Sequence, residues 1–172
     1  MKINFTKIDQ KNLEAIKDLK AGEWIEYSGE FITLRDSSAM KLMEIKNKGE
    51  KLPIKLGGAI ILYGAPTEGD QIIIGPTTSK RMDNSLEYVL GQGVIATVGK
   101  GSRTKDAVEL IKRYRAPYFV MMSGVSAYLS SFFEKGEIIA FKELGPEAVR
   151  KYTVKRLPLL VAIDTKGKSI FN

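Results

Sequence analysis

The sequence predicts an α/β protein with a mixed sheet, flanking helices and a second, smaller sheet. Helical and strand-like segments alternate between residues 78 and 122, which is typical of βαβ units in a partly parallel sheet. Several short strand-like segments then follow with little helix between them, and these later strands suggest the second sheet. The length of 172 residues, with 44% apolar and 27% charged residues, is that of an ordinary globular domain. We therefore expect residues 1–172 to form a single domain.

The first half of the chain is predicted to mix short helices and strands. Two β-type runs, Trp24–Tyr27 and Phe31–Leu34, flank Ser28-Gly29 and predict a hairpin-like pair. The next helix is expected to begin with Asp36 as its cap and to end before Asn47 and Gly49. The elements expected before residue 75 also include a helix over Asp9–Leu19, the body of the capped helix to Ile45, and buried strands over Ala59–Tyr63 and Gln71–Ile74.

The second half of the chain carries the alternating pattern. A helix over Thr78–Leu90 follows the turn at Gly75-Pro76 and ends at Gly91. The elements expected after it are strands over Val94–Val98 and Tyr118–Met122, helices over Ser102–Tyr114 and Val125–Phe133, and strands over Ile138–Phe141, Tyr152–Val154, Leu159–Ile163 and Ser169–Phe171, with a turn over Asp164–Gly167.

The residue types that are missing exclude several kinds of chemistry. The sequence has no cysteine and no histidine, so this chain cannot supply thiol nucleophiles, disulfides, histidine acid–base catalysis, Cys/His zinc sites or iron–sulfur ligands. Its longest apolar runs are far shorter than the ~20 residues that cross a bilayer. The first residues contain no hydrophobic signal core. We expect a soluble, cytoplasmic protein with no bound metal of its own and no membrane partner.

The net charge of +7 raises the possibility of an anionic partner. The most basic stretch, Ser102–Arg115, also carries an apolar helical stripe and has Lys105, Glu109 and Arg113 at i,i+4 spacing. That pattern favours a solvated helix face over a track for phosphates, so we expect no nucleic-acid partner.

Hydroxyl and cationic side chains gather where strands are predicted to end. In Gly75–Asp83, Thr77 and Thr78 come at the expected start of a helix, whose N–H groups favour an anion, and Arg81 follows one turn later. Arg35 and Lys100 follow other strands, and ligands of open α/β sheets bind at the carboxyl ends of strands. Three such cations would suit a small dicarboxylate. The alternative is a threonine cap and surface ion pairs.

These segments resemble the C-terminal (β) part of class I fumarate hydratases and the related L(+)-tartrate dehydratase β subunits. The resemblance runs nearly from end to end, and Gly75–Asp83 is its most specific piece. The other matching segments, in order, are Asp18–Glu23, Tyr27–Gly29, Thr33–Asp36, Gly49–Pro53, Tyr63-Gly64, Gly99–Gly101, Gly145–Ala148 and Ile163–Gly167.

The resemblance implies a swivelling β/β/α domain and an iron–sulfur hydro-lyase that interconverts fumarate and (S)-malate. In the family, three cysteines of the α part hold a [4Fe–4S] cluster, and that part is missing here. The chain is therefore expected to be the β subunit of a hetero-oligomer, inactive without an α subunit that carries the cluster.

The resemblance also implies roles for individual residues. It makes Thr77 the catalytic residue, which takes the C3 proton in the malate-to-fumarate direction. It places Arg35, Arg81 and Lys100 on the substrate carboxylates, with Thr78 as a further substrate-binding residue. Arginine suits a carboxylate because its fork can make two parallel hydrogen bonds. A neutral threonine is a poor base, so Thr77 would need an activating partner group.

One departure from the family pattern and two alternative functions stay open. Ala39 stands where many members carry a histidine, which we expect to alter a local contact or the preferred substrate. Within the same chemistry, the substrate could be L(+)-tartrate or another hydroxy-diacid. A different class of function would be a non-catalytic anion-binding or regulatory module.

Overall fold

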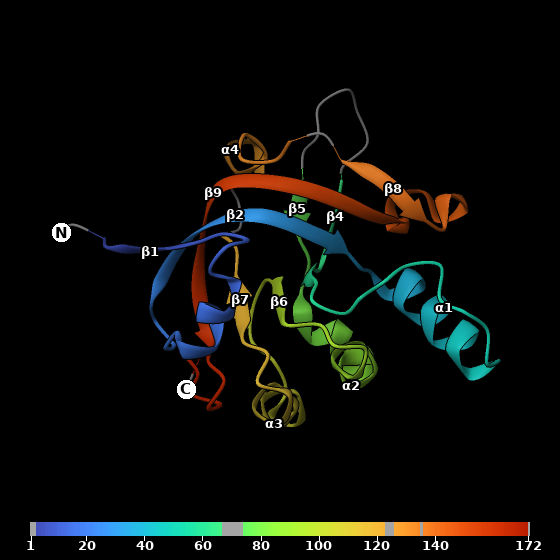
Figure 1. The fold of residues 1–172 in the computed structure, drawn as a ribbon, viewed down its shortest axis with the longest axis horizontal. Coiled ribbons are helices and arrows are strands. Elements are labelled where there is room, and N and C mark those ends of the chain that lie inside the picture. Colours follow the sequence, from blue (N-terminus) through green and yellow to red (C-terminus); the bar gives the residue numbers. More distant parts are fainter. Residues whose placement is uncertain (1–2, 67–73, 123–125, 135, 172) are drawn as a thin grey trace.

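A computed structural model describes residues 3–66, 74–122, 126–134 and 136–171 of the chain (Figure 1). Its described residues form a seven-stranded mixed sheet and a separate two-stranded sheet, so the predicted fold class is confirmed. The strands of the large sheet, in spatial order, are β1 (Phe5–Ile8), β2 (Trp24–Thr33), β3 (Ile60–Leu62), β6 (Ala96–Gly99), β7 (Tyr118–Val120), β9 (Val149–Ile163) and β8 (Glu137–Ala140). The small sheet pairs β4 (Gly64–Pro66) with β5 (Ile74–Pro76).

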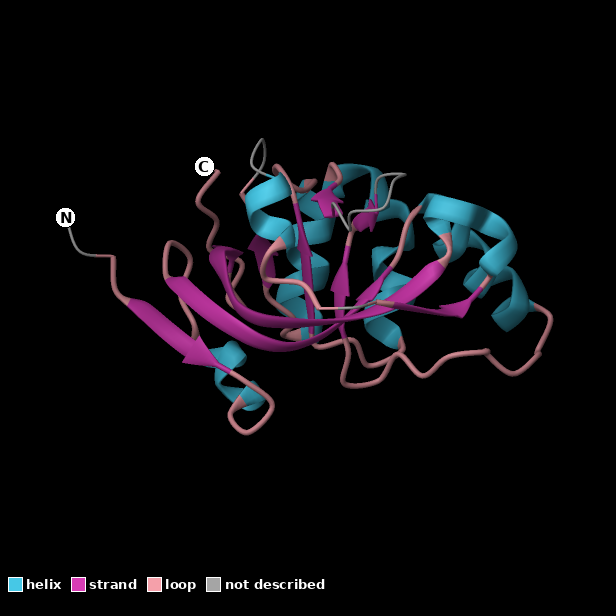
Figure 2. Cartoon of the chain, turned by 90° about the horizontal axis from the view of Figure 1, so that it is seen from above, coloured by secondary structure: helices cyan, strands magenta, loops and turns pink. Residues whose placement is uncertain are grey.

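The helices lie mostly on one side of the large sheet (Figure 2). They are α1 (Asp36–Asn47), α2 (Asp83–Gly91), α3 (Lys105–Tyr114) and α4 (Ser126–Ser130), with 3-10 helices η1 (Leu13–Asp18), η2 (Ser79–Met82) and η3 (Lys142–Glu147). The helices α1, α2 and α3 contribute Leu42, Leu86 and Ile111 to one buried core cluster. Together they cover one face of the sheet, whereas α4 lies on its other side (Figure 1).

The large sheet closes on itself through its two longest strands. Strands β1, β2, β3, β6 and β7 pair in parallel, and β9 is antiparallel to β7, β8 and β2. Side chains alternate between two cores, as strand geometry requires. Ile60 and Leu62 belong to the core on the inner side, and Ile61 between them belongs to the core beneath the helices.

The predicted hairpin around Ser28-Gly29 is wrong. Trp24–Thr33 is one continuous strand that pairs with β9, and the two residues lie at a bulge where the register shifts between Tyr27 and Gly29. The predicted strands Tyr152–Val154 and Leu159–Ile163 are likewise parts of the single strand β9. The later strands therefore join the large sheet, and the small sheet is built from β4 and β5 instead.

Other predicted elements differ from the observed ones in their ends or their type. The helix expected over Asp9–Leu19 is a shorter 3-10 helix, and the one over Thr78–Leu90 is split into η2 and α2. Ser169 makes only an isolated bridge to Ile163, so Ser169–Phe171 is not a strand. Residues 71–73 and Val125 lie outside the described residues. No helix in the described ranges has the length and apolar character needed to span a membrane.

Candidate active site

The loop after β5 and the loop after β6 lie side by side. Thr78 and Lys100 form an isolated parallel bridge, and the N–H of Ser79 donates to the carbonyl of Lys100 at 3.0 Å. Just before them, the N–H and the hydroxyl of Thr77 both donate to the carbonyl oxygen of Tyr63, at 2.8 and 3.2 Å. The backbone register thus brings Thr77, Thr78 and Lys100 to one edge of the sheet.

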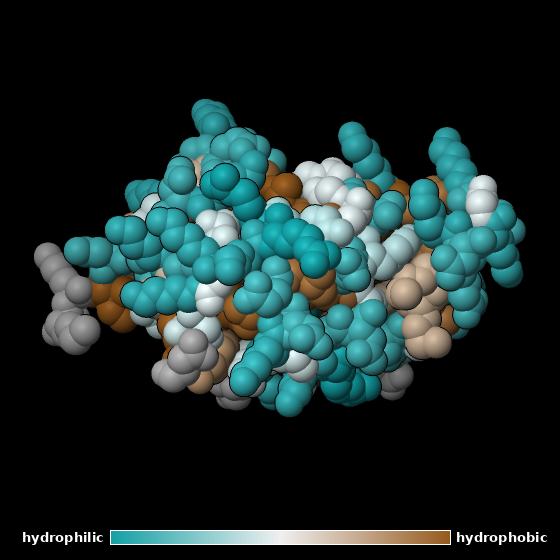
Figure 3. Space-filling view, turned by 90° about the horizontal axis from the view of Figure 1, so that it is seen from below, coloured by the Kyte–Doolittle hydropathy of each residue, from teal (hydrophilic) through white to brown (hydrophobic). Residues whose placement is uncertain are grey.

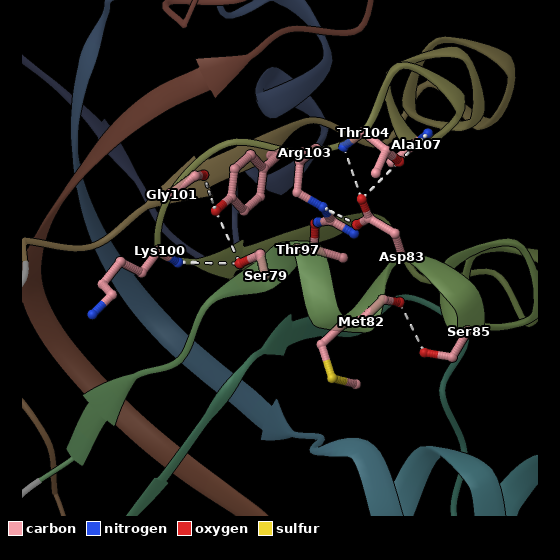
Figure 4. Close-up of polar contacts among 11 residues, drawn as sticks. Ser79, Met82, Asp83, Ser85, Thr97, Lys100, Gly101, Arg103, Thr104 and Ala107 are labelled. Atoms are coloured by element: carbon pink, nitrogen blue, oxygen red, sulfur yellow. Dashed lines mark hydrogen bonds and ion pairs between the residues drawn. The ribbon is translucent and has the colours of Figure 1, made fainter.

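A buried hydroxyl fixes this juxtaposition (Figure 4). Ser79 Oγ accepts the N–H of Lys100 at 3.1 Å and lies 2.9 Å from the hydroxyl of Tyr118. The Tyr118 hydroxyl also donates to the carbonyl of Gly101 at 2.8 Å. The side chain of Lys100 extends away from these contacts and is exposed, so its main chain is held while its ammonium group reaches outward (Figure 4).

A buried ion pair ties the start of α2 to the start of α3. The carboxylate of Asp83 accepts Arg103 Nε at 2.5 Å and both the N–H and the hydroxyl of Thr104 at 2.8 Å. The side chain of Arg103 is 0% exposed, and its guanidinium lies 5.3 Å from the ring centroid of Tyr63 and 4.9 Å from that of Tyr118. The side chains of this cluster face the core and not the solvent, so the cluster holds the loops of the site in place and is not exposed to a ligand.

Burial and neighbouring groups together decide the protonation of this supporting cluster. Burial by itself lowers the pKa of Arg103, but its electrostatic interactions with Tyr63 and Asp83 and the bond to Asp83 raise it, and the net shift is upward. Burial raises the pKa of Tyr118 to about 12, although the bond to Ser79 and the charge of Arg103 oppose the shift. Arg103 therefore stays charged and Tyr118 stays neutral at physiological pH, and neither acts as a proton donor or acceptor there.

The two predicted arginines share one charged cluster. Arg35, the N-cap of α1, places Nη2 3.5 Å from Glu147 Oε1, and Arg81 in η2 places Nη2 3.2 Å from Asp36 Oδ2. Burial tends to raise the pKa of Glu147, but hydrogen bonds from Ser37 and the charges of Arg35 and Arg81 outweigh burial and hold this pKa below its usual value. Both guanidinium groups therefore act on the same carboxylate.

The structure thus brings the five predicted site residues together as two groups. Thr77, Thr78 and Lys100 form one group, Arg35 and Arg81 form the other, and the N–H of Arg81 joins them by donating to the carbonyl of Thr78 at 3.4 Å. The side chain of Arg81 is 61% exposed in its ion pair, which is what the surface-charge alternative also describes. Catalysis and substrate binding by these residues stay predictions.

The helix start expected at Thr78 is corrected by the structure. A four-residue 3-10 turn follows Thr78, and the α-helix begins only at Asp83, whose carboxylate is bound to Arg103 and Thr104. The physical reason is the bridge to Lys100, which keeps the backbone extended through Thr78. An anion in this site would therefore depend on side chains and not on an α-helix N-terminus.

Sequence reasoning missed the residues that hold the site in place. Asp83 and Glu147 lie inside family-like segments but were assigned no role, and their acidic character beside arginines was the available signal. Asp36 was expected only as a helix cap, whereas the N-cap of α1 is Arg35 and Asp36 pairs with Arg81. Arg103 lies in the stretch interpreted as a solvated face, and no local signal distinguishes it from the exposed cations around it. Ala39 is buried in the core beneath α1.

The described residues contain no group of three or more histidine, cysteine, aspartate or glutamate side chains that could hold a metal ion. Iron–sulfur clusters are held mainly by cysteine thiolates, sometimes together with histidine. The 172 residues contain neither residue, so the donor set of this chain does not fit such a cluster.

Fold and site together define an α/β protein whose polar site lies where parallel strands end, the usual place for a ligand in such sheets. The chain matches the family model described as Fumarase C-terminus over residues 1–172, and it belongs to that family.

Its relatives include subunits of larger enzymes. A protein of Methanocaldococcus jannaschii, provisionally named L(+)-tartrate dehydratase subunit beta, is 34% identical over 99% of this chain and 91% of its own length. The L(+)-tartrate dehydratase subunit beta of Escherichia coli K12 is 31% identical, over 91% of this chain and 81% of the relative. Fumarate hydratase 2 of Leishmania major is 27% identical over the whole chain, which spans only 31% of that protein.

Proposed function

We propose that this chain is the β subunit of a hydro-lyase that adds or removes water across a carbon–carbon bond of a four-carbon dicarboxylate. The family and the names of its relatives support this class of reaction. The observation that carries the proposal is the pairing of Thr78 with Lys100. This pairing gathers hydroxyl and ammonium groups beside the two arginines, and such a set suits a substrate with two carboxylates.

Arg81 can exchange its present partner for a substrate. Its side chain is 61% exposed and that of Asp36 is 34% exposed, and ion pairs this open to solvent contribute about 1 kcal/mol or less. A substrate carboxylate that meets the guanidinium fork would form two charge-assisted hydrogen bonds. We assign Arg35, Arg81 and Lys100 to substrate carboxylates, with Thr78 beside them, and we treat Asp36 and Glu147 as groups that hold the arginines between turnovers.

Thr77 is the proposed proton-transfer residue. In the dehydration direction its oxygen would take the proton from C3 of the substrate while the C2–O bond breaks and the hydroxyl group leaves as hydroxide, which becomes water when it takes up a proton. Its own hydroxyl proton is donated to the carbonyl of Tyr63, which orients the group but cannot accept the proton. The general-base role therefore requires an activating group from outside this chain.

A partner subunit would supply what this chain lacks. Thr78, Arg81 and Lys100 are exposed, so the site is open on one side, and two of the relatives above are named as β subunits. We propose that an α subunit closes the site, supplies the group that activates Thr77 and holds the [4Fe–4S] cluster expected for the family.

Two candidate substrates fit this proposal. Fumarate and (S)-malate form the first candidate, and they match the family name. L(+)-tartrate is the second candidate, which the names of the relatives from M. jannaschii and E. coli favour. Ala39 belongs to α1 and its side chain is buried in the core, so no direct contact of this residue with the substrate distinguishes the two candidates.

The test is to assemble the chain with its candidate α subunit under anaerobic conditions, reconstitute the cluster, and measure fumarate hydration and L(+)-tartrate dehydration. We expect turnover of one diacid by the pair and none by this chain alone. A stable, cluster-loaded pair that binds dicarboxylates but converts neither substrate would instead support the non-catalytic anion-binding module.

A further inference from the structure

A cavity lined mainly by charged residues lies at the far end of the sheet from Thr77 and Lys100. Its volume is about 640 Å³, within the usual range for small-molecule sites. Lys100 follows the carboxyl end of β6, whereas the last residue of β9, Ile163, pairs with the first residue of β7. The turn after β9 therefore lies at the amino ends of the parallel strands, and the cavity beside that turn is separate from the candidate active site.

Two family-like segments from opposite ends of the sequence build this cavity. The N–H of Ala21 donates to Asp164 Oδ2 at 3.2 Å, and the hydroxyl of Thr165 donates to the carbonyl of Lys17 at 2.8 Å. Asp164 is only 4% exposed, and its other oxygen accepts the N–H groups of Lys166 and Lys168 at 2.9 and 3.1 Å. The carboxylate is thus used to shape the turn, and the lysine side chains on the turn are left for other contacts.

The walls of the cavity are strongly basic. Six of the ten lining residues are cations and two are aspartates, so the lining alone carries +4 of the chain's net charge of +7. The cations are Lys17, Lys20, Lys112, Arg115, Lys166 and Lys168. The surrounding face, seen from the side of α2 and α3, is mostly hydrophilic (Figure 3). Neighbouring like charges repel one another, so this concentration costs free energy unless an anion neutralises it.

Ordinary structural roles account for only part of this charge. Lys17 pairs with Glu14 at 2.7 Å, and Lys112 pairs with Glu109 at 3.7 Å. Lys112 and Arg115 also lie at the C-terminus of α3, where the helix dipole favours a cation. Neither explanation applies to the cations on the two loops that face α3. Within the described ranges, no ion pair engages Lys20, Lys166 or Lys168.

We propose that this cavity binds a small multivalent oxyanion, a molecule with two or more adjacent phosphate or carboxylate groups. The anion would be reached from two loops by Lys20, Lys166 and Lys168, and from the end of α3 by Arg115. Three separate segments can then surround clustered negative charge, whereas a single carboxylate or phosphate would satisfy only one or two of the cations. The proposal does not depend on the reaction at Thr77.

The test is isothermal titration calorimetry of the full chain with inorganic triphosphate, ATP and citrate at moderate salt. We expect one anion to bind per chain. The double variant Lys20→Gln/Lys168→Gln should weaken that binding by at least about tenfold, since it removes two charge-assisted contacts. It leaves the N–H groups around Asp164 in place, so the turn should stay folded, and thermal melts check this. The matched control, Lys46→Gln/Lys142→Gln, removes the same charge from α1 and η3 and should change the affinity less than about twofold.

The three probes separate the sources of the anion. Tighter binding of ATP than of triphosphate would identify a nucleotide, similar binding of both would identify polyphosphate, and binding of citrate alone would identify a polycarboxylate. Arg81→Met should change the affinity for the anion less than about twofold, because Arg81 lies in the other site. Absence of binding by all three probes, equal losses in the two double variants, or a tenfold loss in Arg81→Met would each overturn the proposal.

Discussion

The hydroxyl of Ser79 occupies the space that a side chain on Gly99 would need. A Cβ atom at position 99 would overlap Ser79 Oγ, the same oxygen that accepts the N–H of Lys100 and meets the hydroxyl of Tyr118. This glycine is required for close approach and not for an unusual backbone angle. It lets the loops that carry Thr77 and Lys100 come together.

We therefore expect Gly99→Ala to destabilise the protein by about 1–3 kcal/mol, because the new methyl group overpacks this contact. Ser79→Ala should cost a similar amount, since it leaves the N–H of Lys100 without its partner. The double variant should cost less than the sum of the two, because removing Oγ makes room for the methyl group. Urea unfolding of the four proteins measures this coupling, and strict additivity would contradict the close approach.

The buried pair of Asp83 and Arg103 should contribute far more to stability than an exposed pair on the same helix. Asp83→Asn leaves the Arg103 charge buried without compensation and should cost about 3–5 kcal/mol. Glu87→Gln is the matched control, since it breaks the pair with Arg113 on the exposed face of α2, and it should cost under about 1 kcal/mol. Equal losses in denaturant unfolding would show that the buried pair carries no special role.

Thr77→Val keeps the shape of the side chain and removes its hydroxyl. If Thr77 transfers a proton, kcat of the assembled enzyme should fall by roughly 10²–10⁴-fold. A purely structural role would remove only the hydrogen bond to Tyr63, with a loss of about 1 kcal/mol in stability and nearly normal turnover. Turnover and thermal melts measured together separate the two roles.

Substrate binding by the cations predicts a graded response at Arg81. Arg81→Lys keeps the charge but loses the bidentate fork, and Arg81→Met loses both, so kcat/KM should fall in that order, with the larger loss about 10-fold or more. Arg35→Met and Lys100→Met should act similarly. The measurement is kcat/KM of the assembled pair at low and moderate salt. Near-normal values at all three positions would mean that these are surface charges.

The lowered pKa of Glu147 predicts a pH-dependent contribution to stability. Its pKa in the folded protein lies below the ordinary value of 4.5, so the ionised carboxylate stabilises the fold above pH 4.5 and this contribution is lost as the pH falls through the lower folded value. Glu147→Gln should therefore reduce stability at neutral pH, and its difference from the wild type should shrink below pH 4.5. A difference that does not vary between neutral and acidic pH would contradict the ion pair with Arg35 and the effect of the Arg81 charge on Glu147.

Local pattern was enough to predict several elements and the place of the candidate site. The helix expected over Ser102–Tyr114 is observed over Lys105–Tyr114, with Ala107 and Ile111 buried as its spacing indicates. Helical periodicity is a local property, so it needs no knowledge of distant partners. Strands followed by hydroxyls and cations likewise predicted that Thr77 and Lys100 would lie at strand ends.

The long strands were decided by tertiary structure. Trp24–Thr33 looks like two runs separated by a turn signal, but pairing with β9 keeps it extended through the bulge at Gly29. Strand β1 was not predicted, because three of its four residues are exposed and it has no buried alternation. The strand is defined by its backbone pairing with β2, and backbone pairing alone does not require a recognisable pattern of side chains in the sequence.

The sequence by itself determined the fold class, the family resemblance and the residue types available for chemistry, because composition, periodicity and motif order are properties of the chain alone. Only the tertiary structure decided which charged side chains are buried and which of them form ion pairs with one another. Arg103 sits among exposed cations in sequence, and it is buried because Asp83, twenty residues away, and two tyrosine rings meet it. The energy of a charge depends on what surrounds it in space, and that surrounding is assembled only when the sheet closes.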